Sequence, residues 1–183
     1  MDNGAGSYRR FLAGDDEGLA EIVREYKDGL ILYLNGYVRN LYIAEELAED
    51  TFFRLITKRP RFSQKSSFKS WLYAIGRNVA VDFVRRNSKQ ISVSAEGMEV
   101  LGKELSLEEA YIREESKAEV YKALSKLSVD YRNVLWLSFF EGFSNREVAK
   151  VMKKSDRQVK NLLYRAKQSL RSILEKKGFH YEK

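Results

Sequence analysis

Two helix-start signals stand eleven residues apart near the end of the chain, and they restrict the fold more than any other feature. Ser144 precedes Glu147 by three residues, and Ser155 precedes Gln158 by the same interval. In this spacing the two side chains of each pair cap backbone N–H groups of a first helical turn, so each pair begins a helix. Because only a short turn fits between the two helices, the segment predicts a helix-turn-helix.

The residues around these starts suit a close pair of helices. Ala149 lies in the middle of the first helix, where a small side chain lets the second helix approach. Lys153 stands at the turn, where one residue tends to need a positive φ, at a cost of about 1 kcal/mol for a residue other than Gly. An ordinary helical hairpin with a basic surface is the alternative. The apolar residues that can fill the space between the helices are Val148, Met152, Val159 and Leu162.

The second helix of this pair carries side chains that suit a nucleic acid. Arg, Asn and Gln near the start of such a helix can contact base edges in the major groove, and further Lys and Arg can contact phosphates. The outer face of this helix is expected to hold Asp156, Arg157, Lys160, Asn161 and Tyr164. The candidate DNA contacts are Ser155, Arg157, Gln158, Lys160, Asn161, Tyr164 and Arg165.

The distribution of charge supports a polyanionic partner. The chain has a net charge of +7 over 183 residues. Residues 1–94 hold 15 basic and 12 acidic residues, a net +3, and residues 95–120 hold 3 and 8, a net −5. Residues 121–183 hold 15 and 6, a net +9, so the helix-turn-helix lies in the most basic part.

Apolar residues at helical spacing predict an all-α protein of two helical domains joined by a flexible linker, the C-terminal domain being the helix-turn-helix. Periodicity fails after residue 87, and Gly97 and Gly102 interrupt the segment that follows. We therefore expect domains at 1–87 and 106–183, with a linker at 88–105. The expected helices are residues 15–40, 43–58, 68–86, 106–126, 129–141, 144–152 and 155–177. Leu47, Phe52, Leu55 and Ile56 should face inward from the second of them.

Several classes of function lack support. The chain has no Cys, and His180 is its only His, which disfavours thiol chemistry and metal sites. No P-loop, nucleophile elbow or Gly-rich phosphate loop is present. Residues 1–10 lack the apolar core of a signal peptide, and no apolar segment has the length of a membrane span. We expect no catalytic residue, no metal, no cofactor, no membrane insertion and a cytoplasmic location.

The chain resembles a bacterial RNA polymerase sigma factor of the extracytoplasmic-function (ECF) type, in the sigma-70 family. Residues 44–52 (AEELAEDTF) look like the family's helix for core RNA polymerase, and residues 68–78 (FKSWLYAIGRN) like its helix for the −10 promoter element. Only a linker separates these two signatures from the positions that match the family's last domain. This short separation suggests the ECF subgroup. The positions matching the family's last domain are Leu127, Arg132, Val134, Leu135, Leu137, Glu141, Gly142, Ser144, Glu147, Val148, Ala149, Val159, Lys160, Leu163, Arg165, Ala166 and Leu170.

The resemblance implies a role for each group of residues. The recognition helix would read the −35 element. The residues implied to bind core polymerase are Glu45, Glu46, Leu47, Glu49, Asp50 and Phe52. Those implied to hold the −10 element are Phe62, Ser66, Ser67, Phe68, Lys69, Arg77, Asn78, Arg85 and Arg86. The implied partners are core RNA polymerase, promoter DNA and an anti-sigma factor, which is often membrane-anchored in this family.

Other interpretations of the same residues stay open. The acidic helix could be a solvated face, residues 61–69 a mere connection, and the linker either a disordered segment or a nucleic-acid mimic. Trp71 lies on the apolar stripe of its helix, so we expect it in the core rather than on DNA. At the level of the whole protein, a stand-alone transcription regulator or an enzyme would be the competing functions.

Overall fold

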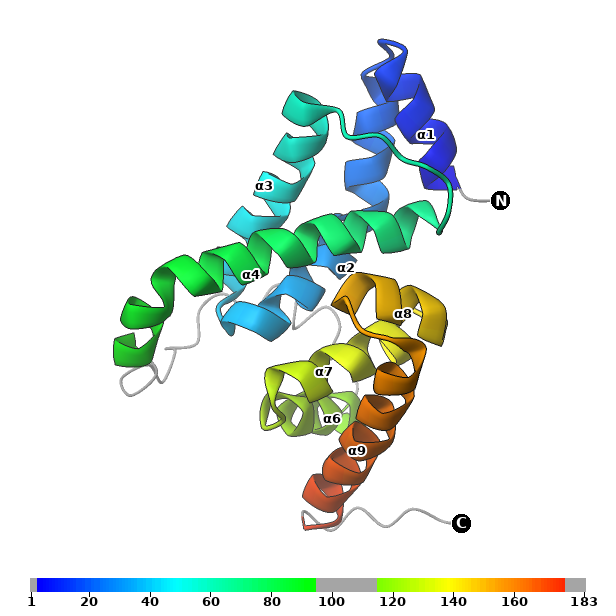
Figure 1. The fold of residues 1–183 in the computed structure, drawn as a ribbon. Helices are drawn as coiled ribbons and strands as arrows, with labels where there is room; N and C mark the ends of the chain where they lie inside the picture. The colour runs from blue at the N-terminus through cyan, green and yellow to red at the C-terminus, as the bar shows by residue number, and fades with distance from the viewer. Residues whose placement is uncertain (1–2, 95–114, 177–183) are drawn as a thin grey trace.

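The computed structural model describes residues 3–94 and 115–176, and every regular element in those ranges is a helix (Figure 1). This confirms the all-helical class. In the described part of the chain, none of the helices combines the length and apolar character needed to cross a membrane. The elements are α1 (Asn3–Leu12), α2 (Glu17–Val38), α3 (Leu41–Lys58), α4 (Phe68–Ser94), α6 (Glu115–Ser125), α7 (Val129–Leu135), η1 (Trp136–Phe140), α8 (Asn145–Met152) and α9 (Asp156–Glu175).

Helix α2 is the centre of the first domain and packs against α1, α3 and α4. Its apolar stripe faces the core, with Ile22 and Leu30 at 0% exposure and Leu19 and Val23 partly buried. An aromatic cluster closes the end of the domain where α1 meets the start of α4. Ring centroids lie 5.2 to 5.6 Å apart for Phe68 with Tyr8 and Phe62, and for Trp71 with each of these three rings. Trp71, predicted to lie in the core, is partly buried and packs against the core from its edge.

Helix α1 is an element that helical spacing did not predict. Its sequence contains Gly4 and Gly6, which lower helix propensity. Long-range packing compensates, because Tyr8 and Phe11 are buried at 1% and 3% exposure. The Tyr8 hydroxyl also donates a hydrogen bond of 2.8 Å to the Pro60 carbonyl. Burial raises the pKa of Tyr8 to about 12, so this donor keeps its proton.

Helix α4 ends eight residues later than predicted. It continues from Arg86 to Ser94 because no Gly or Pro stands between Asn87 and Ser94 to stop it. The first part of the predicted linker is therefore helical. The rest of that linker, and residues 106–114 of the next predicted helix, lie outside the described residues.

The second domain confirms the helix-turn-helix in α8 and α9. Both helices begin with a reciprocal capping box, from Ser144 and Ser155. Lys153 adopts a φ of +54°, the left-handed conformation expected at the turn. Val148, Ala149 and neighbouring apolar residues are buried between the helices. The preceding helix, predicted as residues 129–141, ends instead in the π-helical segment η1, where the Glu141 N–H donates to the Trp136 carbonyl at 3.2 Å.

The two domains pack against each other. Helix α8 lies against α4, and α7 lies against the last turns of α2 (Figure 1). Gly36 of α2 allows this approach, because a Cβ atom there would overlap the Asn133 side-chain oxygen. The Arg132 guanidinium crosses the same seam and donates to the Gly36 carbonyl at 2.7 Å.

Candidate nucleic-acid interface

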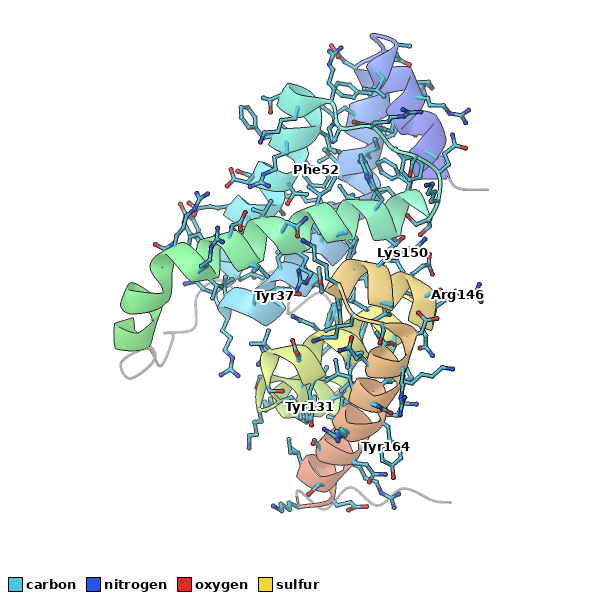
Figure 2. All side chains as sticks on the ribbon, in the orientation of Figure 1. Tyr37, Phe52, Tyr131, Arg146, Lys150 and Tyr164 are labelled. Carbon is cyan, nitrogen blue, oxygen red and sulfur yellow. The ribbon has the colours of Figure 1, made fainter. Side chains whose placement is uncertain are left out.

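Helix α9 presents a continuous polar face to solvent. Arg157, Lys160, Asn161 and Arg165 are exposed, and Tyr164 is 67% exposed. Figure 2 shows Tyr164 projecting from α9, while the helix packs on the rest of its domain through its opposite side. In helix-turn-helix proteins the second helix turns a face of this kind toward the major groove.

Two of the predicted contacts have a structural task as well. The Gln158 backbone N–H donates to the Ser155 hydroxyl at 3.2 Å, and the Ser155 N–H donates to the Gln158 side-chain oxygen at 2.8 Å. Both side chains are exposed beside the first turn of α9. Ser155 and Gln158 therefore set where the recognition helix starts.

A shallow hollow of about 300 Å³ flanks this face. Gln158, Asn161 and Arg165 line it together with Tyr131 of α7. Lys154 lies on the same rim and pairs with Asp130 at 3.1 Å. Sequence reasoning missed Tyr131, because its place beside the recognition helix comes from tertiary packing alone.

The acidic helix α3 divides its predicted contacts between surface and core. Glu46, Glu49 and Asp50 are exposed, and Glu45 is partly exposed. Lys27 of α2 pairs with Glu45 at 3.1 Å. Leu47 and Phe52 are 3% and 6% exposed, so in this structure they pack inside the domain.

The surface beside these carboxylates is more apolar than the sequence suggested. Ile56, predicted to face inward, is 44% exposed, and Phe53 is 60% exposed. Both line a hollow of about 430 Å³ with Glu49 and Asp50. The helical spacing did not predict that Phe53 belongs to this surface. Phe53 follows the buried Phe52, and apolar residues cover a wide arc of the helix.

The predicted −10 residues lie along the loop before α4 and along α4 itself. Phe68 is fully buried and cannot reach a nucleotide, whereas Phe62 and Ser66 line an open groove of about 980 Å³ between α1, α2 and the loop. Farther along α4, Arg77 and Asn78 are partly exposed and Arg85 and Arg86 are exposed. The groove also holds Arg9, Arg10 and Arg24, which sequence reasoning did not connect with this loop.

Two of the predicted −10 residues contact the second domain. The Ser67 hydroxyl donates to a Glu147 carboxylate oxygen at 2.5 Å. The Lys69 ammonium lies 2.8 Å from the Glu141 carboxylate and donates to the Glu141 carbonyl at 3.1 Å. Burial alone would raise the pKa of Glu147, but hydrogen bonds from Ser67 and Ser144 outweigh it, and the pKa is lowered.

The fold and surface together define a two-domain helical DNA-binding protein. The family model for sigma-70 region 2 matches residues 22–90, and the model for sigma-70 region 4 matches residues 117–170. The chain belongs to the sigma-70 family of RNA polymerase sigma factors, within the ECF group.

Its relatives agree with this assignment, and solved structures share its fold. The chain is 29% identical over 155 residues to the ECF RNA polymerase sigma factor SigX of Bacillus subtilis, covering 82% of this chain and 80% of that one. It is 26% identical over 153 residues to SigM of the same species, covering 84% and 93%. The fold matches CnrH, solved with the cytosolic domain of CnrY, with a TM-score of 0.64 at 20% identity over 94% and 95% of the two chains. It also matches the sigma factor RpoE of Bartonella quintana, solved with the anti-sigma factor NepR, with a TM-score of 0.65 at 21% identity over 85% and 96%.

Proposed function

We propose that this protein is an ECF-type sigma factor that binds core RNA polymerase, directs it to promoters through their −10 and −35 elements, and promotes initiation. The observation that carries this is the presence of both sigma-70 regions on one chain, with the recognition face of α9 exposed. The chain itself would supply binding free energy, and the polymerase would supply the chemistry. Its place of action would be the cytoplasm, and its further partner an anti-sigma factor, as in the solved complex of RpoE with NepR.

The exposed part of α3 is the proposed contact with core polymerase. Glu46, Glu49 and Asp50 offer negative charge, and Phe53 and Ile56 offer apolar area beside it. Such a mixture fits a basic partner surface with an apolar centre. Leu47 and Phe52 would support the contact indirectly, by holding α3 on the domain.

The first prediction concerns this contact. Glu46→Lys together with Asp50→Lys should weaken binding to core polymerase by about tenfold or more, since like charges then face the partner. Melting temperature should stay within a few degrees of the wild type, because both positions are exposed. Glu25→Lys with Asp28→Lys on α2 makes the same charge change at other exposed positions and should bind normally. Equal affinities of the two double variants for core enzyme would reject the assignment of α3.

The second prediction concerns the domain organisation, for which we keep the boundaries 1–87, 88–105 and 106–183. Limited proteolysis of the isolated chain should cut first between residues 95 and 105, because Gly97 and Gly102 stand there and α4 extends to Ser94. Mass spectrometry of the first fragments locates the cut. Initial cleavage inside α4 or α9 would argue against these boundaries.

A further inference from the structure

A cavity of about 300 Å³ lies between the two domains. Leu32, Asn35 and Gly36 of α2 form one wall, and residues of α6, α7 and η1 in the second domain form the others. Cavities of this size at domain interfaces, with apolar walls and a few polar groups, are the usual setting of small-molecule sites. The lining shares no residue with the surfaces proposed above for polymerase or DNA, so a ligand here would be a function beyond promoter recognition.

The aromatic part of the wall is already fixed in place. Trp136 is 7% exposed, its ring stacks on Phe140 with centroids 4.4 Å apart, and its indole N–H donates to Glu141 at 2.9 Å. Tyr121 of α6 adds a second lining ring, with its centroid 5.9 Å from that of Trp136. A flat ring entering the cavity would therefore meet a formed apolar surface, and little ordering of the protein would oppose its binding.

Two arginines give the cavity a positive charge, and none of its described lining residues is acidic. Burial, with a further contribution from the Arg39 charge, lowers the pKa of Arg132 to about 10, so both groups are cations at neutral pH. Arg39 is exposed, and its guanidinium makes one long hydrogen bond, 3.4 Å to the Leu127 carbonyl. Its remaining donors suit an anionic group at the rim of the cavity.

Two amide oxygens in the wall lack a donor. The side-chain oxygens of Asn35 and Asn133 are buried, and neither accepts a hydrogen bond within the part of the chain that the structure describes. Buried acceptors normally have a partner, because an unsatisfied one lowers the stability of the fold. An N–H or O–H group on a bound molecule would supply that partner after a small turn of the Asn35 amide.

We propose that this cavity binds a small aromatic carboxylate that carries an N–H or O–H donor. The ring packs against Trp136 and Tyr121, the carboxylate pairs with Arg39, and the donor bonds an asparagine oxygen of the wall. Because both domains contribute lining residues, the bound molecule bridges them, and the site is complete only while they are packed together.

The test uses the whole chain and three probes of this class: para-hydroxybenzoate, para-aminobenzoate and indoleacetate. The chain has two tryptophans, so a proton–nitrogen correlation spectrum contains two indole N–H signals, which Trp71→Phe assigns. Trp136 lines the cavity, whereas Trp71 lies in the aromatic cluster of the first domain and serves as an internal reference. At least one probe should shift the Trp136 signal saturably, with a Kd of about 1 mM or tighter for a molecule of this size, and leave the Trp71 signal in place.

The charge requirement is tested at the rim. Arg39→Gln should weaken binding about fivefold or more, the scale of one charge-assisted hydrogen bond. Arg59→Gln is the matched control, because Arg59 follows α3 as Arg39 follows α2, exposed and with a positive φ. Its Kd should stay within about twofold of the wild type. The neutral para-hydroxybenzamide should bind the wild type about as weakly as para-hydroxybenzoate binds Arg39→Gln.

The location of the site is tested by obstruction. Ser125 lines the cavity and is exposed, so Ser125→Phe places a large ring there without altering the core, and it should abolish the saturable shift. Lys126→Phe adds the same ring at the next position, which is exposed and does not line the cavity, and it should bind normally. Melting followed by circular dichroism should keep both variants within a few degrees of the wild type.

Two results would overturn the proposal. One is that none of the three probes shifts the Trp136 signal at about ten times the expected Kd. The other is binding that Arg39→Gln and Ser125→Phe both leave unchanged, which would place the probe elsewhere on the chain. These measurements need neither polymerase nor promoter DNA, so transcription directed by the wild-type chain remains a separate test of the proposed function.

Discussion

Replacing Arg132 with alanine is expected to lower the free energy of unfolding by about 3 kcal/mol or more. Its side chain is buried, and the guanidinium donates to the carbonyls of Leu124, Leu127, Ser125 and Gly36 at 3.1, 2.9, 3.3 and 2.7 Å. Burial, together with the nearby Arg39 charge, lowers the pKa of Arg132 to about 10, so the group is still charged at neutral pH. Removing it takes the guanidinium donor from all four carbonyl oxygens. Leu124 would still accept from the Leu127 N–H at 3.0 Å, and Leu127 from Arg39 at 3.4 Å.

Urea denaturation followed by circular dichroism measures this effect. Arg132→Lys should fall between the wild type and alanine, because one ammonium cannot reach acceptors on several sides of the planar guanidinium. Arg157→Ala is the matched control on an exposed arginine and should stay within about 0.5 kcal/mol. Equal stability of the Arg132→Ala and Arg157→Ala proteins would contradict the role assigned to these hydrogen bonds.

The second large effect is expected at the −35 element. Arg157 is exposed in the first turn of α9, where helix-turn-helix proteins place base contacts, and Arg165 lies about two turns further along. Arg157→Ala should cost about 1–3 kcal/mol at the preferred −35 sequence and relax the preference at one or two base pairs. Arg165→Ala should weaken binding to all sequences about equally and reduce the salt dependence by about one unit of slope.

Holoenzyme binding to a randomised −35 library gives both base-preference profiles at once. The comparison uses the same core enzyme and the same salt series for both variants, because affinities at different salt concentrations cannot be compared. A changed sequence preference for Arg165→Ala, with an unchanged one for Arg157→Ala, would mean that α9 lies in the groove in another orientation.

The sequence predicted the parts of the fold that local signals determine. Both capping boxes, the left-handed Lys153 and the buried Ala149 agree with the structure, because each follows from residues within one helical turn. The assignment of the chain to the sigma-70 family also came from such local motifs and is confirmed by the family models.

The features that escaped prediction depend on distant parts of the chain. Helix α1 is held by the buried rings of Tyr8 and Phe11 despite its glycines, and the π-helical η1 has no local sequence signal. The contact of Lys69 with Glu141 spans 72 positions and follows no periodicity. On α3, the helical spacing of the residues identified the acidic face but did not predict that Ile56 is exposed. Apolar residues cover a wide arc of this helix, and the sequence does not show which edge of the arc the neighbouring helices cover.

Run-off transcription with purified core RNA polymerase on genomic fragments from the source organism tests the central claim most directly. Adding the wild-type chain should produce discrete transcripts whose start regions share −10 and −35 sequences, and core enzyme alone should not produce them. The Glu46→Lys, Asp50→Lys chain serves as a folded variant that should lose these transcripts. Transcripts that are the same with and without the wild-type chain would contradict its function as a sigma factor.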